Sequence, residues 1–308
     1  MTLNLPKTTT SAIADALMKS RHRVGGGTMG MVLTLVIVTD EANHYDALRA
    51  ATEAGHEHPC RVLVLIQREP HAEPHIDAEI RSSGEMGPGE GVLLRTYGAL
   101  NRHADAVVIP LLVPDAPVVV WWPAAGPAAP AKDSVGVLAQ RRITDSQNAS
   151  DPVRALVDRT AHYTPGDTDL SWARITPWRT LLASLLDQPC EWISAATVAA
   201  EADLASAHLL ASWLESKLGA PVTMQRSDGP GITEVRLSTA EGEIAVERPD
   251  GRTATLVYPG KPDRTVALPR LSAAEAMAEE LRRLDPDEVY EEAAQHLLQT
   301  HRSAQPAG

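Results

Sequence analysis

Four arginines in the middle of the chain stand close in sequence to carboxylates, and they carry its strongest chemical signal. The set is Arg141, Arg142, Arg174 and Arg179, with Asp145 and Asp169 beside them. A guanidinium presents a planar fork of donors that fits a phosphate or a carboxylate. The cluster therefore predicts either contacts that join two domains or bind a protein partner, or a site for a small anion. We favour the first role, because the chain's own carboxylates can pair with the arginines.

Two adjacent tryptophans, Trp121 and Trp122, end an unbroken apolar run that begins at Val118. A run without polar alternation is typical of a strand covered on both faces. Ligands and partners usually dock at the carboxyl edge of a sheet made of such strands. Both indoles can cap the core, or one can face outward and anchor a protein partner. Trp172 is the third candidate anchor.

Two weaker patterns point to a metal and to a dinucleotide. His56, His58 and Cys60 alternate, as zinc ligands on one face of a strand would, but Pro59 interrupts them and no second cysteine pair completes a zinc motif. We expect a polar loop there, with Cys60 a small buried hydrophobe. The segment Gly25–Gly30 matches G-x-G-x-x-G, but the dinucleotide motif must follow a strand and open a helix. Here the order is reversed, so we expect a connector.

No sequence motif for catalysis accompanies these residues. The chain contains no G-x-S-x-G elbow, no phosphate-binding loop ending in Gly-Lys-Ser/Thr and no H-E-x-x-H. Asp167 and Asp169 form a pair of carboxylates suited to acid–base chemistry, but turn and capping roles explain them equally well. We predict no catalytic residue, no cofactor and no metal.

In the first half of the chain, strands and helices alternate. We expect strands at 32–38, 61–66, 76–81, 91–97 and 118–122, with helices at 8–21, 41–54 and 152–162 and a crossover helix within 100–112. The strands on either side of helix 41–54 form a βαβ unit and should be parallel. This half predicts a three-layer, Rossmann-like α/β sheet domain.

The second half changes character to α+β. We expect helices at 176–187 and 205–218, strands at 192–200, 222–226, 232–238, 243–248, 252–258 and 263–268, and terminal helices at 273–284 and 285–300. Glu241-Gly242 and Asp250-Gly251 are hairpin turns, so the last four strands form an antiparallel meander. The turn at residues 165–167 divides the chain into predicted domains 1–165 and 166–308.

Charge, cysteine count and hydropathy disfavour several classes of partner and cellular location. The 308 residues carry a formal net charge of -12, which disfavours nucleic acid and anionic membranes as partners. Two cysteines far apart in sequence do not make a disulfide framework. The N-terminus shows no basic-then-apolar signal, and no run of about 20 apolar residues occurs. These features predict a soluble, cytoplasmic protein.

Several longer segments resemble one known family. They are LTLVIVTD (33–40), EHPCRVLVL (57–65), VVIPLLVPDAPVVVWWP (107–123), LAQRRITDS (138–146), YTPGDTDLSWARITPWRTLLA (163–183) and RRLDPDEVY (282–290). Together they resemble the OpcA family of glucose-6-phosphate dehydrogenase assembly proteins. The resemblance extends from about residue 5 to about residue 300, and the Trp-Trp-Pro and Thr-Asp-Leu-Ser-Trp segments are its most specific parts.

The resemblance implies a protein that is not an enzyme. Members of this family bind glucose-6-phosphate dehydrogenase, favour its active oligomeric form and thereby support NADPH production in the oxidative pentose phosphate pathway. Such an allosteric effector needs aromatic and arginine anchors rather than a catalytic pocket. The expected anchors are Trp121, Trp122, Arg141, Arg142, Asp145, Asp169, Trp172, Arg174 and Arg179.

Three points stay open from the sequence. Some members of the family are linked to redox control through cysteines, but no thiol switch maps onto Cys60 or Cys190. The main alternative function is a phosphosugar- or nucleotide-binding enzyme or sensor that uses the arginine cluster at the sheet edge. The surface that binds the dehydrogenase and the stoichiometry do not follow from the sequence.

Overall fold

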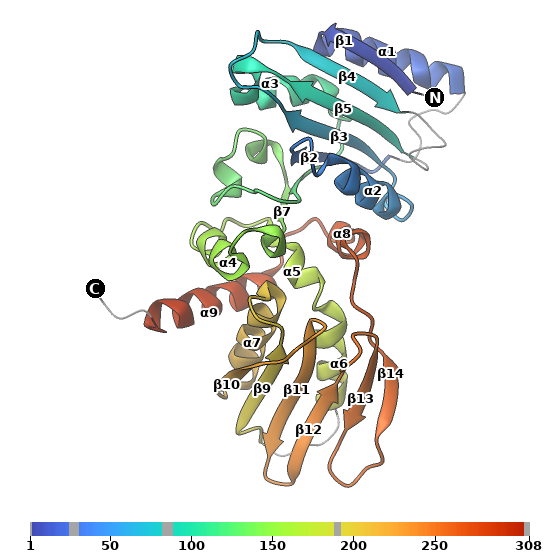
Figure 1. Ribbon diagram of the computed structural model, residues 1–308. Helices are drawn as coiled ribbons and strands as arrows, with labels where there is room; N and C mark the ends of the chain where they lie inside the picture. Colours follow the sequence, from blue (N-terminus) through green and yellow to red (C-terminus); the bar gives the residue numbers. More distant parts are fainter. Residues whose placement is uncertain (1, 25–30, 82–88, 188–191, 305–308) are drawn as a thin grey trace. The chain divides into compact units, whose positions relative to one another are not determined.

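The computed structural model describes residues 2–24, 31–81, 89–187 and 192–304 (Figure 1). These residues form two compact units, each assembled from separate segments of the chain. Unit 1 comprises residues 1–145, 164–168 and 273–286, and unit 2 comprises residues 146–163, 169–272 and 287–308. The domain division at residues 165 and 166 stays a prediction, because compactness does not show which segments fold independently.

Unit 1 is built on an eight-stranded sheet. In spatial order its strands are β1 (Thr2–Thr8), β4 (Ile76–Arg81), β5 (Glu90–Thr96), β3 (Cys60–Gln67), β2 (Leu33–Thr39), β6 (Val118–Trp122), β7 (Arg141–Thr144) and β8 (Asp167–Asp169). The five strands from β5 to β7 are parallel, and β4 and β1 extend the sheet in antiparallel pairing. The predicted parallel βαβ unit is confirmed, with Val36 opposite Leu63.

Helices lie on both sides of this sheet (Figure 1). They are α1 (Thr10–Val24), α2 (His44–Ala54), α3 (Ala104–Val108) and α8 (Ala273–Leu281), with 3₁₀ turns at Gly98–Arg102, Ile109–Leu111, Pro130–Lys132 and Gly136–Leu138. Ile13 of α1 and Val108 of α3 pack with Val36 and Val120 in one apolar cluster. Helix α2 contacts β2, β3 and α8. The predicted three-layer arrangement is confirmed.

Unit 2 contains a six-stranded sheet and five helices in its described part. The strand order is β10 (Val222–Arg226), β9 (Ala195–Ala200), β11 (Ile232–Thr239), β12 (Gly242–Glu247), β13 (Thr253–Val257) and β14 (Arg264–Ala267). The helices are α4 (Pro152–Thr160), α5 (Leu170–Ala173), α6 (Thr176–Leu186), α7 (Ala205–Leu218) and α9 (Glu288–Ala304), with a 3₁₀ turn at Ser146–Asn148. The predicted antiparallel meander is confirmed.

One face of this second sheet carries the core of unit 2. Val198, Val235 and Val246 project from β9, β11 and β12 into a cluster with Leu182 of α6 and Leu210 of α7. The alternation of apolar and polar residues along these strands produces this division, because successive side chains point to opposite faces.

Helix ends account for two differences from the expectation. Helix α2 begins at His44 instead of residue 41, because the Asp40 carboxylate accepts hydrogen bonds from the amides of Ala42 and Asn43 in a turn before the helix. Helix α9 begins at Glu288, and its cap is Asp287 instead of Asp285.

Three further differences concern strands and a crossover. Strand β9 begins at Ala195, three residues later than expected. The crossover before β6 is a short helix and a 3₁₀ turn, because Pro110 cannot continue an α-helix. Strand β1 was not expected, and residues 25–30, which match G-x-G-x-x-G, lie outside the described residues.

Candidate functional site

Seven of the nine residues expected to bind a partner are buried. They are Trp121, Trp122, Arg141, Arg142, Asp145, Asp169 and Trp172, each at most 6% exposed. Arg174 and Arg179 are intermediate in exposure. A buried side chain has almost no area to offer a partner while the fold is intact. The structure therefore gives the seven residues internal contacts, and the assignment of the set to partner binding stays a prediction.

In unit 1, Arg141 and Arg142 join three segments through ion pairs. Arg141 donates from Nη2 to Oε2 of Glu280 at 2.6 Å, and from Nη1 to the carbonyl of Asp285 at 3.1 Å. Arg142 pairs with Asp167 and also donates to the carbonyls of Ala139 (2.8 Å) and Pro165 (2.6 Å). These hydrogen bonds connect β7 with the segment before β8 and with the end of α8.

Burial and ion pairing act in opposite directions on the pKa of Asp167 in this network. Burial raises the pKa of Asp167, and the hydrogen bond and charge of Arg142 oppose that shift. The second oxygen of Asp167 accepts from the backbone amide of Thr164 at 2.8 Å. Both oxygens of Asp167 are thus engaged inside the protein. Asp167 and Asp169, for which the sequence left both acid–base chemistry and turn or capping roles open, each belong to a separate internal network.

In unit 2, Asp169 organises the second network. Its Oδ2 accepts from the amide of Ser146 at 2.9 Å and from the Ser146 hydroxyl at 2.6 Å, and its Oδ1 accepts from the amide of Ser171 at 3.0 Å. Arg159, which the sequence did not single out, donates to the Ser146 hydroxyl and lies 3.6 Å from Asp169. Asp169 is therefore the cap of the short helix α5 and the anchor of the 3₁₀ turn before α4.

Trp172 lies beside this network, in the core of unit 2. Its Nε1 donates to Oδ2 of Asp287 at 2.8 Å. The guanidinium of Arg179 stacks 3.6 Å from the indole ring centre, and the ring of Tyr290 lies 5.7 Å away. Since Oδ1 of Asp287 also caps α9, the indole fixes the start of the last helix.

The two adjacent tryptophans of β6 are core residues, each 2% exposed. Trp122 packs in the cluster that contains α1 and α3. Since successive residues of a strand face opposite sides, Trp121 points to the other face of the sheet. Of the two roles open from the sequence, capping the core therefore describes both indoles.

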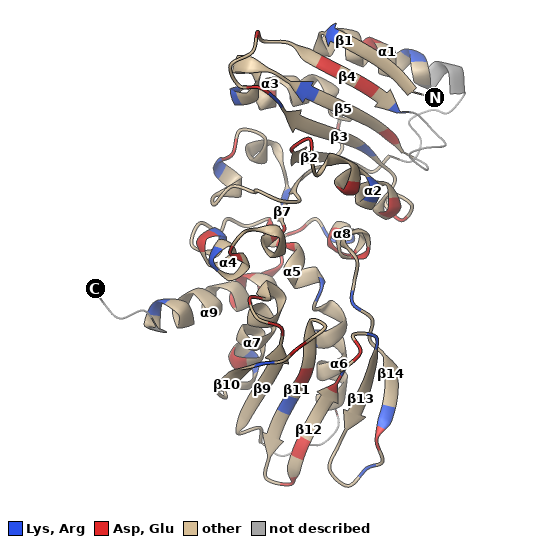
Figure 2. Cartoon of the chain, viewed as in Figure 1, with Lys and Arg blue, Asp and Glu red and all other residues tan. Residues whose placement is uncertain are grey.

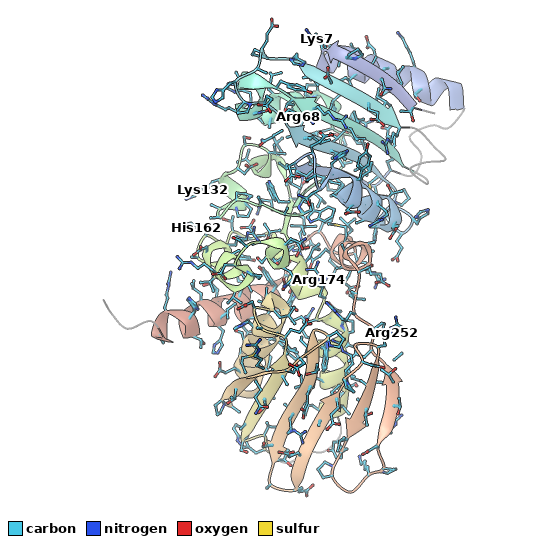
Figure 3. All side chains as sticks on the ribbon, in the orientation of Figure 1. Lys7, Arg68, Lys132, His162, Arg174 and Arg252 are labelled. Atoms are coloured by element: carbon cyan, nitrogen blue, oxygen red, sulfur yellow. The ribbon has the colours of Figure 1, made fainter. Side chains whose placement is uncertain are left out.

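Arg174, labelled in Figure 3, follows α5 and is half-buried. Its neighbour Arg179 donates to the hydroxyl of Thr176 at 2.9 Å as well as stacking on Trp172. These two residues are the only members of the expected set with substantial exposed area in the described structure. The structure does not bring all four arginines into one anion site: two pair within unit 1 and two lie in unit 2.

The alternating histidines and Cys60 do not form a ligand set. Nε2 of His58 lies 3.1 Å from the carbonyl of Ala278, and Nδ1 of His56 lies 3.2 Å from the carbonyl of Glu53. Within the described ranges, no three His, Cys, Asp or Glu side chains are placed to hold a metal ion. None of the helices in those ranges combines the length and apolar character needed to cross a bilayer.

The carboxyl edge of the parallel sheet is where a doubly wound fold would bind a nucleotide. Strand β2 lies between β3 and β6, so the strand order reverses there, and α2 begins at this point. In nucleotide-binding sheets, free amides at the start of such a helix hold the phosphates. Here the Asp40 carboxylate accepts from the amides of Ala42 (3.0 Å) and Asn43 (2.9 Å). These two amides lie in the turn before the helix, which begins at His44, and the negative charge of Asp40 beside it disfavours a phosphate there.

Two partly buried arginines at the same edge are also paired. Arg68 (labelled in Figure 3) and Arg95 lie 2.7 Å and 3.2 Å from the same oxygen of Glu41. Burial raises the pKa of Glu41, but the hydrogen bonds from Arg95 and Arg68 outweigh it and lower the pKa below its ordinary value. Glu41 therefore stays ionised and compensates both arginines.

Two protein-family models match this chain. One family model, described as the N-terminal domain of a glucose-6-phosphate dehydrogenase subunit, matches residues 51–161. A second, described as the C-terminal domain of the same subunit, matches residues 165–294. The chain belongs to the OpcA family. The resemblance seen in the sequence is thereby confirmed, and it gives this OpcA-family protein an association with glucose-6-phosphate dehydrogenase.

Solved structures show only distant likeness to this OpcA-family protein. KijD10, a 3-ketoreductase from Actinomadura kijaniata in complex with NADP and TDP-benzene, is 11% identical, with 87% of this chain and 96% of that chain covered and a TM-score of 0.49. An oxidoreductase domain protein from Kribbella flavida is 9% identical, with 89% and 98% covered and a TM-score of 0.47. No curated protein sequence matches the chain significantly.

Redox control through cysteines, as attributed to some members of the OpcA family, would require a reactive thiol, and Cys60 is one of the two cysteines of this chain. Its thiol is 2% exposed, and burial raises its pKa to about 12. Because the thiolate is the reactive form, a thiol in this environment is inert at neutral pH. Cys190, the other cysteine, lies outside the described residues.

Proposed function

We propose that this protein is a non-enzymatic partner of glucose-6-phosphate dehydrogenase that binds the enzyme and favours its active oligomeric form. The observation that carries the proposal is the match of both OpcA family models, which together cover most of the chain. By favouring the active enzyme, the protein supports NADPH production in the oxidative pentose phosphate pathway. Its cytoplasmic location stays a prediction.

Two features of the site favour a partner over an enzyme. The Asp40 carboxylate accepts from the amides of Ala42 and Asn43 just before α2, and its negative charge disfavours a phosphate at the start of that helix. The arginines that would clamp a phosphosugar are engaged internally: Arg141 by Glu280, and Arg142 by Asp167. The alternative of a phosphosugar- or nucleotide-binding enzyme is therefore less favoured, because two of the four arginines on which it rested, Arg141 and Arg142, are engaged internally.

The energetics of such a partner are modest. A protein that binds the assembled enzyme more tightly than the separated subunits shifts that equilibrium by its difference in affinity. Coupling energies of about 1–3 kcal/mol are typical and change populations roughly 5- to 150-fold. No catalytic group is needed for this effect.

The test is a titration of the dehydrogenase from the same source with this protein, with light scattering measured in parallel. We expect a saturable change in the Michaelis constant or the maximal rate together with a heavier complex, and no turnover of glucose 6-phosphate by this protein alone. Absence of both a complex and a kinetic change would refute the proposal. A thermal shift of this protein with glucose 6-phosphate or NADP alone would support the alternative instead.

A further inference from the structure

The open face of the six-stranded sheet in unit 2 has a distinctive set of side chains. In Figure 1, α6 and α7 lie behind this sheet, α4, α5 and α9 lie beyond one end of its strands, and most of the face toward the viewer shows strands that no helix covers. The cross-strand register identifies the residues on that face. They are 195, 197 and 199 on β9, 223 and 225 on β10, 234, 236 and 238 on β11, 243, 245 and 247 on β12, 253, 255 and 257 on β13, and 265 and 267 on β14.

Most of these side chains are small. Alanine, threonine and serine fill ten of the sixteen positions, and Gln225 and Val257 are the two larger uncharged ones. A face of small side chains lets another surface approach closely over the whole sheet. Six strands spaced about 4.8 Å apart and about 17 Å long span about 400 Å² in plane. That is about half the area that one partner buries in a standard protein interface.

The four charged residues of this face form one cluster in its centre. Arg236 pairs with Glu234, with Glu243, and with Glu247 at 3.4 Å (Figure 2). The other charged residues of these strands, Arg226 and Arg264, lie on the opposite face of the sheet, because their register partners Ala200 and Leu256 face the core. One arginine and three glutamates leave the face with a net charge of -2.

The net charge of this face favours one kind of binding partner over another. A second copy of the chain would bring a like charge of -2 against the cluster, which is unfavourable. The carboxylates of Glu243 and Glu247 are 50% and 43% exposed, so they can accept further donors. A lysine or arginine of another protein, placed between them, would complete the charge balance.

An exposed tryptophan stands at one end of the same sheet. Trp192 is 75% exposed and precedes β9, where the amide of Ser194 donates to the carbonyl of Ser238 on β11. Tryptophan is the residue type most enriched among side chains that dominate binding energy in protein interfaces. Trp192 is therefore an exposed apolar side chain close to one end of this sheet.

We propose that this open face is the docking surface for glucose-6-phosphate dehydrogenase, and that basic side chains of the dehydrogenase pair with Glu243 and Glu247. The inference rests on the proposed function and adds the surface and the chemistry of the contact. Trp192 contributes close to one end of the sheet, and the small residues of the neighbouring strands allow close approach.

The test measures the affinity of purified protein for the dehydrogenase at low and high salt. The charge variant is Glu243→Gln with Glu247→Gln, and its matched control is Glu73→Gln with Glu288→Gln, which changes net charge equally at exposed positions elsewhere. The steric variant is Thr255→Trp. We expect the charge variant to bind about 10-fold more weakly at low salt with a smaller salt dependence, because attraction between surface charges is screened by ions.

The steric variant should lose at least 10-fold in affinity, and the control should stay within 2-fold of the parent. Circular dichroism checks folding, and Thr197→Trp replaces Thr255→Trp if that variant does not fold. Unchanged affinity of both the charge and steric variants would overturn the inference while leaving the proposed function intact. Self-association of the parent that Thr255→Trp abolishes would assign the face to a second copy and overturn it too. A parent protein that does not bind the dehydrogenase would refute the proposed function itself.

Discussion

Removing Arg142 tests whether the buried ion pairs hold unit 1 together. Arg142→Met would leave the Asp167 carboxylate without its counter-ion, and the carbonyls of Ala139 and Pro165 without their donors. Breaking one side of a buried pair typically costs about 3–5 kcal/mol. Protonation limits that cost: neutralising a carboxyl group of ordinary pKa at pH 7 requires about 4 kcal/mol. We therefore expect a loss of about 4 kcal/mol in the free energy of unfolding at pH 7.

The pH dependence of this loss follows from the pKa of Asp167. Burial already raises that pKa in the intact protein, and Arg142 opposes the shift. Without Arg142 the folded-state pKa of Asp167 rises further above its unfolded value. A carboxyl group of this kind contributes stability fully below its unfolded pKa, and that stability is lost as pH rises through the folded pKa. The gap between Arg142→Met and the parent should therefore be small near pH 4 and grow toward pH 7.

The assay is urea denaturation between pH 4 and pH 7, followed by circular dichroism and tryptophan fluorescence. Asp167→Asn is the reciprocal variant, and the double variant with Arg142→Met leaves no buried charge. Replacing both members of a buried pair often costs little, so we expect the double variant to be more stable than either single one at pH 7. Single variants that each lose less than about 1 kcal/mol, or a penalty that is independent of pH, would refute a structural role for the pair.

Other predictions test the remaining buried groups. Trp172→Phe should cost about 1.5–3 kcal/mol by removing the hydrogen bond to the Asp287 carboxylate, and Trp172→Ala about 3–5 kcal/mol, both measured by urea denaturation. Arg248→Met should cost about 2–4 kcal/mol in the same assay, because the buried guanidinium donates to the carbonyls of Ile232 and Leu268; exposed Arg252→Met, within about 0.5 kcal/mol of the parent, is its control (Figure 3). A thiol reagent should modify Cys60 only after unfolding, and peptide mapping of the native protein at neutral pH would reveal any earlier reaction.

Local sequence signals predicted most of the elements. The unbroken apolar run at residues 118–122 predicted a strand buried on both faces, and Glu241-Gly242 and Asp250-Gly251 predicted two hairpins of the meander. Strand β1 was not predicted because Thr2–Thr8 is mostly exposed and contains Pro6 and Lys7, so its apolar alternation is limited to Leu3 and Leu5. This strand is ordered by pairing with β4, which lies about 70 residues away in sequence, and local strand propensity does not indicate such a contact.

The sequence did not reveal that most of the residues expected to bind a partner are buried. Arg141 looked like a surface anchor because its partner Glu280 lies 139 residues away in sequence. No spacing rule connects two such positions, and arginines are mostly exposed in proteins. Similarly, the capping role of Asp287 depends on Trp172, which is 115 residues away. Spacing identifies residues that can pair, but tertiary contacts decide whether they pair with each other or with a partner.

These buried contacts change where binding residues should be sought in this protein. The segments that carry the resemblance to the OpcA family, such as 138–146 and 163–183, coincide with the two ionic networks and with Trp172. The buried residues of these segments make internal contacts, whereas Arg174 and Arg179 keep exposed area. The docking surface proposed for the dehydrogenase consists instead of side chains whose hydrogen-bonding groups remain accessible, as on the open face around Arg236. Substitutions in the buried motifs would lower binding only together with stability, whereas substitutions on that face should lower binding and leave stability unchanged, so measuring both quantities on each variant separates the two roles.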